Sequence, residues 1–119
     1  MQFTDPDLLS ALDRASPAEL DKLAFGVIGM DAAGVVEHYN AWEARAARLD
    51  PAWVIGRNFF HEVGLCMNNF MVGHRYRSAE RLDEILDYVL TFRMKPTPVR
   101  LRLLKGPEAR LDWMAVDWS

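Results

Sequence analysis

Cysteine is scarce in this sequence: Cys66 is the only one among 119 residues. A single thiol cannot form a disulfide within the chain, and it cannot supply the several sulfur ligands of a zinc or iron–sulfur site. The histidines, His38, His61 and His74, share no ligand spacing, so we expect no metal site. Cys66 is therefore either a small buried apolar group or a site of covalent attachment or nucleophilic attack.

Long hydrophobic runs and an excess of basic residues are also missing. No apolar run approaches the roughly 20 residues that a membrane-spanning helix needs. The formal net charge is -3, whereas a nucleic-acid-binding surface is normally basic. The N-terminus, Met-Gln-Phe-Thr-Asp-Pro, has neither the basic start nor the apolar stretch of an export signal. We therefore expect no membrane and no nucleic-acid partner, and a reducing, bacterial-type cytoplasmic location.

The sequence is rich in core-forming residues. Half of its residues are hydrophobic and 26% are charged, which is typical of a globular protein. A chain of 119 residues is long enough for one domain with a real core. Because no repeat or linker divides it, we predict a single domain over residues 1–119.

Two helix-start signals lie close to the N-terminus. Asp5-Pro6 and Ser16-Pro17 each combine a capping side chain with a proline suited to the first helical turn. Leucines recur on one helical face after the first signal, and Glu19 completes a capping box with Ser16. The pattern predicts a helical cap over residues 1–22. It would lie on a sheet through its leucines and could detach from the core at 23–119.

Five later segments have the patterns of strands: 25–30, 35–39, 85–94, 99–104 and 110–118. A turn from Asp31 to Gly34 joins the first two, and Gly26 and Gly29 suggest that something packs closely on the first. Helical patterns lie between the second and third, the longest over 70–83. We predict an α+β fold with a five-stranded antiparallel sheet and helices packed on one face.

Two polar side chains stand at the start of the helix predicted over 40–48. Tyr39 and Glu43 are four residues apart, so they project from the same side if the helical turn begins near Tyr39. Asn40 can cap this helix. The ordinary alternative for Glu43 is a solvated carboxylate paired with a nearby arginine such as Arg45.

The stretch from Tyr39 to Cys66 resembles the photoactive yellow protein family. The residues that carry the resemblance are Tyr39-Asn40-Ala41, Glu43, Asp50-Pro51, Val54-Ile55-Gly56-Arg57-Asn58-Phe59-Phe60 and Cys66. The tyrosine, glutamate and cysteine fall in the family's order and almost its spacing, and the similarity runs from about residue 20 to the C-terminus. The resemblance implies a PAS fold and a blue-light photoreceptor that is not an enzyme.

The resemblance also implies a site. p-Coumaric acid would be bound to Cys66 as a thioester, and its phenolate would accept hydrogen bonds from Tyr39 and from a protonated Glu43. Met94 takes the position that covers the chromophore in the family, although a methionine is equally often plain core filling. Light would isomerise the chromophore from trans to cis. Proton transfer from Glu43 and loosening of the N-terminal cap would then pass the signal to an unknown downstream protein.

Some positions depart from the family and leave alternatives open. Trp42, Ala47, Leu49, Gly64-Leu65 and Leu90 stand where the family usually has other residues. These departures bear on colour, photocycle rate and chromophore loading. One alternative is a pigment-free PAS module that binds proteins or small ligands. Another is an enzyme with Cys66 as acyl acceptor, but no histidine is placed by sequence to activate the thiol. We expect a monomer or weak homodimer. The tryptophans are most simply core and interface residues, and an exposed aromatic at Trp113 or Trp118 would mark a partner surface.

Overall fold

The computed structural model describes residues 1–91 and 94–118. Two helices come first and a hairpin follows: α1 (Leu8–Arg14), α2 (Pro17–Leu20), β1 (Gly26–Met30) and β2 (Val36–Tyr39). The middle of the chain is helical: α3 (Ala41–Ala47), α4 (Pro51–Val54), the π-helical turn η1 (Phe59–Val63), the 3-10 turn η2 (Leu65–Met67) and α5 (Gly73–Ser78). Three strands complete it: β3 (Leu82–Leu90), β4 (Thr97–Lys105) and β5 (Asp112–Asp117).

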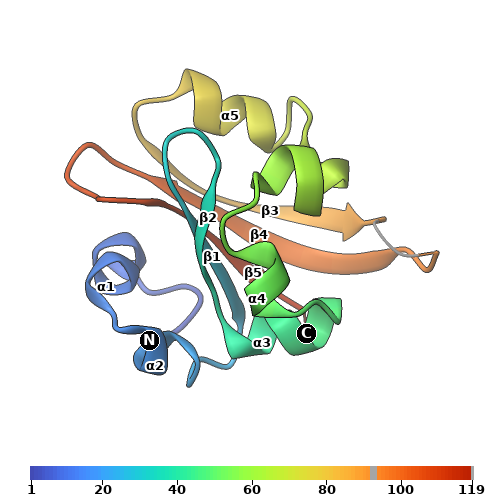
Figure 1. The fold of residues 1–119 in the computed structure, drawn as a ribbon. Coiled ribbons are helices and arrows are strands. Elements are labelled where there is room, and N and C mark those ends of the chain that lie inside the picture. Colours follow the sequence, from blue (N-terminus) through green and yellow to red (C-terminus); the bar gives the residue numbers. More distant parts are fainter. Residues whose placement is uncertain (92–93, 119) are drawn as a thin grey trace.

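The strands form one antiparallel sheet in the order β2-β1-β5-β4-β3. The cap helices α1 and α2 lie on one side of this sheet, and the segment from α3 to α5 lies on the other (Figure 1). The predicted α+β fold with a five-stranded antiparallel sheet is therefore confirmed. Among the described residues, no helix has the length and apolar character needed to cross a bilayer.

The central strand β5 contributes to a core on each face of the sheet. Met114 and Val116 belong to the main core under α3 to α5, while Trp113 and Ala115 belong to a second core under the cap. Successive side chains of a strand point to opposite faces, so a strand covered on both sides is apolar throughout. The sheet is thus the shared wall between the cap and the rest of the molecule.

The cap is held by leucines and by a polar anchor. Leu8 and Leu12 are buried in the second core and Leu9 packs against it partly buried, as their spacing predicts, and Leu20 of α2 is buried there too. The Asp13 carboxylate of α1 accepts hydrogen bonds from the Trp113 indole Nε1 at 2.9 Å and from the Arg110 amide at 2.7 Å. These bonds tie α1 to β5 and to the turn before it.

Arg102 of β4 is far more buried than the strand pattern predicts. Its alternation with leucines predicts that it lies on a solvent-exposed face of the sheet, yet only 4% of Arg102 is exposed. Its guanidinium donates to both carboxylate oxygens of Asp83, at 2.8 and 3.0 Å, and to the backbone carbonyls of Phe3 and Asp5, at 2.9 and 2.7 Å. The prediction was wrong because the N-terminal segment covers this face of the sheet.

The boundary between the longest helix and the third strand also differs from the prediction. The helix predicted over 70–83 ends at Ser78 in α5, and β3 begins at Leu82 rather than at Ile85. Leu82 pairs with Lys105, so the hairpin with β4 runs over nine residue pairs. Continuous pairing satisfies the backbone groups that a longer helix would otherwise satisfy. Phe92 and Arg93, assigned to the end of this strand by pattern, lie outside the described residues.

Candidate functional site

Asn40 fixes the start of α3 and thereby the position of Glu43. Its side-chain oxygen accepts from the amides of Glu43 at 3.1 Å and Val27 at 2.9 Å. Its side-chain nitrogen donates to the carbonyls of Leu20 at 2.9 Å and Phe25 at 3.0 Å. The predicted N-cap is confirmed, and the same buried amide also joins α3 to β1 and to the end of the cap.

Glu43 is a buried carboxyl, not the solvated helix carboxylate of the ordinary alternative. Only 4% of the residue is exposed, and its Oε1 accepts a hydrogen bond of 2.8 Å from the Trp118 indole Nε1. Burial raises the pKa of this carboxyl from 4.5 to about 7, although the Trp118 bond acts in the opposite direction. Glu43 therefore keeps its proton through the mildly acidic range.

Gly26 of β1 makes room for this carboxyl. A Cβ atom at Gly26 would lie 1.8 Å from Oε1 and 2.9 Å from Cδ of Glu43. We expect Gly26→Ala to push the Glu43 side chain out of place and to destabilise the protein by about 2 kcal/mol, as for other overpacked cores. Urea unfolding measures the loss.

The double variant Gly26→Ala/Glu43→Ala separates this clash from other effects of the alanine. Removing the obstructing carboxyl should recover most of the stability lost in Gly26→Ala, measured against Glu43→Ala alone. Equal losses with and without the carboxyl would show that contact with Glu43 is not the cause.

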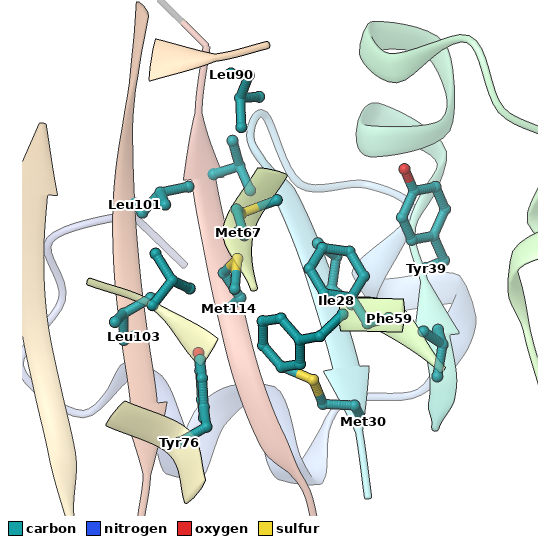
Figure 2. Packing of buried hydrophobic residues seen from close by; sticks show 14 of the residues in the cluster. Ile28, Met30, Tyr39, Phe59, Met67, Tyr76, Leu90, Leu101, Leu103 and Met114 are labelled. Carbon is teal, nitrogen blue, oxygen red and sulfur yellow. The ribbon is translucent and has the colours of Figure 1, made fainter. Parts of the chain in front are cut away.

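Tyr39 and Glu43 line the same small cavity, although Tyr39 ends β2 and α3 begins only at Ala41, so the helical turn assumed in the prediction does not start at Tyr39. Its remaining walls are apolar: Ala47, Leu49, Phe59, Val63, Gly64, Met67, Leu90 and Val116. The cavity volume is about 20 Å³, which is room for about one water molecule. Figure 2 shows Tyr39, Phe59, Met67 and Leu90 as members of the main core, which fill the space around this cavity.

Cys66 lies in η2 and is held through its backbone. The residue is half-buried against the main core, and its carbonyl accepts from the Tyr88 hydroxyl at 2.6 Å and from the Asn69 side-chain nitrogen at 3.1 Å. Gly64 and Met67 line the cavity of Tyr39 and Glu43, but Cys66 does not. Cys66 therefore belongs to a segment that borders the cavity, although it is not itself one of the lining residues.

Met94 is placed differently from expectation, whereas the last tryptophans are not. Met94 is fully exposed and does not line the cavity. Trp113 is only 1% exposed, which agrees with the core role expected of the tryptophans. Trp118 packs on the main core and contacts Glu43 across 75 residues of sequence. No local pattern signals a contact of that separation, which is why sequence reasoning missed it.

Comparison with known proteins finds relatives over nearly the whole chain. It is 35% identical to the photoactive yellow protein of Halochromatium salexigens, over 98% of this chain and 95% of the relative. It is 30% identical to that of Rhodothalassium salexigens, over the same shares of the two chains. No protein-family model matches the sequence.

The solved structures agree. The photoactive yellow protein domain of the sensor histidine kinase Ppr from Rhodospirillum centenum superposes with a TM-score of 0.81 at 34% identity, covering 90% of this chain and 96% of that one. A PAS domain of an HTR-like protein from Haloarcula marismortui shares the fold at 17% identity, with a TM-score of 0.63 over 93% of this chain and 95% of that chain. The chain, with a PAS fold and a buried tyrosine–glutamate pair near its single cysteine, belongs to the photoactive yellow protein family.

Proposed function

We propose that this protein is a blue-light photoreceptor that carries p-coumaric acid as a thioester on Cys66. The observation that carries the proposal is the burial of Tyr39 and Glu43 on one cavity, bordered by the segment that holds Cys66. Relatives named photoactive yellow protein at 30–35% identity support it.

The chemistry of these residues fits a phenolate. A buried anion without a cation requires hydrogen-bond donors, and charge-assisted bonds are the strong ones. The Tyr39 hydroxyl is one donor, and Glu43 is a second because burial raises its pKa to about 7. Two such donors on one cavity are what an ionised ring oxygen needs.

The space is occupied by the chain itself. A cavity of about 20 Å³ does not hold an aromatic acyl group. Loading requires side chains such as Met67, Phe59 or Leu90 to give way, together with movement of the segment from Gly64 to Asn69 that carries the thiol. Met94 covers the ring only by folding inward from its exposed position.

When bound, p-coumarate supplies absorption of blue light and trans–cis isomerisation. Glu43 would be the proton donor to the ring oxygen, and its loss of the proton would leave a buried carboxylate, which is costly in an apolar cavity. α3 responds at its first turn, where Asn40 donates to the Leu20 carbonyl and the Ala41 amide donates to Asp21 at 2.8 Å. Loss of these bonds loosens the cap, residues 1–22, and exposes a surface for a downstream signalling protein.

A second candidate is a pigment-free PAS module that acts by protein interaction. The observation that favours it is the nearly filled cavity, because an apolar core without room for a chromophore is already complete. In that case Cys66 is a small core residue and Glu43 is a buried carboxyl with a structural role.

Supplying the chain with an activated p-coumaroyl ester separates these candidates. The photoreceptor is expected to gain the mass of one coumaroyl group on Cys66, to turn yellow, and to bleach reversibly in blue light. Cys66→Ser, which replaces the thiol by a hydroxyl of similar size, is the control and should stay colourless. An unmodified thiol in the wild-type chain would favour the pigment-free module, and turnover of the ester that is lost in Cys66→Ser would indicate an enzyme.

A further inference from the structure

The indole of Trp118 reaches the buried carboxyl from the far end of the chain. Trp118 follows β5 directly, and its Nε1 donates to Oε1 of Glu43 at 2.8 Å. Figure 1 shows the carboxyl end of the chain beside α3, in agreement with this contact. The indole nitrogen can only donate, so the direction of the bond does not change with the protonation of Glu43.

This bond is stronger when Glu43 is ionised. A hydrogen bond to a carboxylate is roughly twice as strong as one to a neutral acceptor, and more so where water is excluded. Burial favours the protonated carboxyl and the Trp118 bond favours the carboxylate. The indole therefore offsets part of the cost of a negative charge in this cavity.

Few other groups compete for this role. Apart from Glu43, Tyr39 is the one titratable residue among those that line the cavity in the described part of the chain. β1, on which α3 packs, carries no charged residue, and Asp117 of β5 pairs with Arg100 instead. Arg45 of α3 lies over the ring of Trp42.

We propose that Trp118 is the positioning residue of Glu43: it holds the carboxyl in place, stabilises it once ionised, and couples that ionisation to the carboxyl end of β5. The coupling is a property of the pigment-free chain. Its role in signalling rests on the proposed function: Trp118 donates a hydrogen bond to the carboxylate that remains after Glu43 has released its proton. Ionisation of Glu43 then strengthens the bond to Trp118 and so fixes the segment after β5 more firmly. This is a second path for the signal, besides loosening of the cap.

Titration of Glu43 in the pigment-free protein tests the proposal. The infrared carbonyl band of the protonated carboxyl, identified by its absence in Glu43→Gln, is followed with pH. Trp118→Phe is expected to raise the midpoint by about one pH unit, a tenfold weaker acid, since one hydrogen bond to the charged form is lost. An unchanged midpoint would overturn the proposal.

Trp42→Phe is the matched control. It removes another indole from the neighbourhood of Glu43, but the Trp42 Nε1 is buried without a hydrogen-bond partner in the described structure. The Glu43 midpoint should therefore stay where it is in the wild-type chain. Equal shifts in both variants would mean that lost packing, not the lost bond, moves the midpoint, and would also overturn the proposal.

A second measurement does not depend on the folding of Trp118→Phe. In protein labelled with ¹⁵N-tryptophan, the four indole N–H signals are resolved by NMR, and the Trp118 signal is assigned by elimination from Trp→Phe variants of the other three tryptophans. The Trp118 signal should move with pH at the Glu43 midpoint, and should not move in Glu43→Gln. A Trp118 chemical shift that does not change at the Glu43 midpoint would overturn the coupling. Because no pigment is present, either result is independent of whether Cys66 can be loaded.

Discussion

Replacing Glu43 by glutamine is expected to stabilise the pigment-free protein at pH 8 by about 3 kcal/mol and to change little below pH 4.5. The folded pKa is raised from 4.5 to about 7, because burial disfavours the charged carboxyl. A raised pKa contributes stability that is fully present below the unfolded value and is lost as pH rises through the folded value. Over the roughly 2.5 units between them, the loss is about 3 kcal/mol.

Urea unfolding of both proteins between pH 4 and pH 8.5 measures this difference. The wild-type free energy of unfolding should fall relative to Glu43→Gln between about pH 4.5 and 7, and the two curves should run parallel above that range. Glu62→Gln is the control, because Glu62 is a half-exposed carboxylate paired with Arg57. Curves for wild type and Glu43→Gln that stay parallel throughout would show that the pKa of Glu43 is the same in the folded and unfolded protein, which would contradict a pKa raised by burial.

Removing the Arg102 side chain is expected to destabilise the protein by about 3 kcal/mol and to free the N-terminal segment. Truncating one partner of a buried, hydrogen-bonded ion pair typically has a cost of this order. In Arg102→Ala the carbonyls of Phe3 and Asp5 lose their donor, while Asp83, which is half-exposed, can be rehydrated. Urea unfolding measures the free energy, and limited proteolysis measures the accessibility of residues 1–22.

Arg100→Ala is the matched control for Arg102→Ala. Arg100 lies two residues earlier on the same strand, with 45% of its side chain exposed, and pairs with Asp117 at 2.7 Å. Arg100 also lies over the Phe3 ring, 5.0 Å from its centroid, but its partly exposed ion pair contributes only about 0–1 kcal/mol, so Arg100→Ala should be the milder variant. Similar losses in the two arginine variants, or an unchanged cleavage rate in Arg102→Ala, would contradict a specific role of Arg102 in holding the cap.

Local signals in the sequence predicted much of the fold. The capping box of Ser16 and Glu19, the turn ending at Gly34, and the N-cap at Asn40 all occur where the residues indicate. Each depends on hydrogen bonds over a few residues, and the sequence displays such separations directly. Tyr39 and Glu43 also meet at one cavity, but they do so because β2 ends at Tyr39 directly before α3, not through helical spacing.

Other features depend on which segments of the sequence meet in space. The alternation along β4 marked Arg102 as exposed, because nothing in a strand pattern says that residues 3–5 will cover that face. The longest helix ends at Ser78 because the residues after it form β3, which pairs with β4, a strand about 20 residues further along the chain. These outcomes are set by long-range burial, which overrides local preference.

The sequence by itself determined the antiparallel sheet, the capping box of α2 and the N-cap of α3, because strand period and short-range capping specify them. Only the tertiary structure decided that Gly26 accommodates the Glu43 carboxyl, that Trp118 donates to it, and that the surrounding cavity is nearly filled. Burial of a charge and the volume left by packed side chains are properties of contacts between distant segments, so they exist only once those segments have come together.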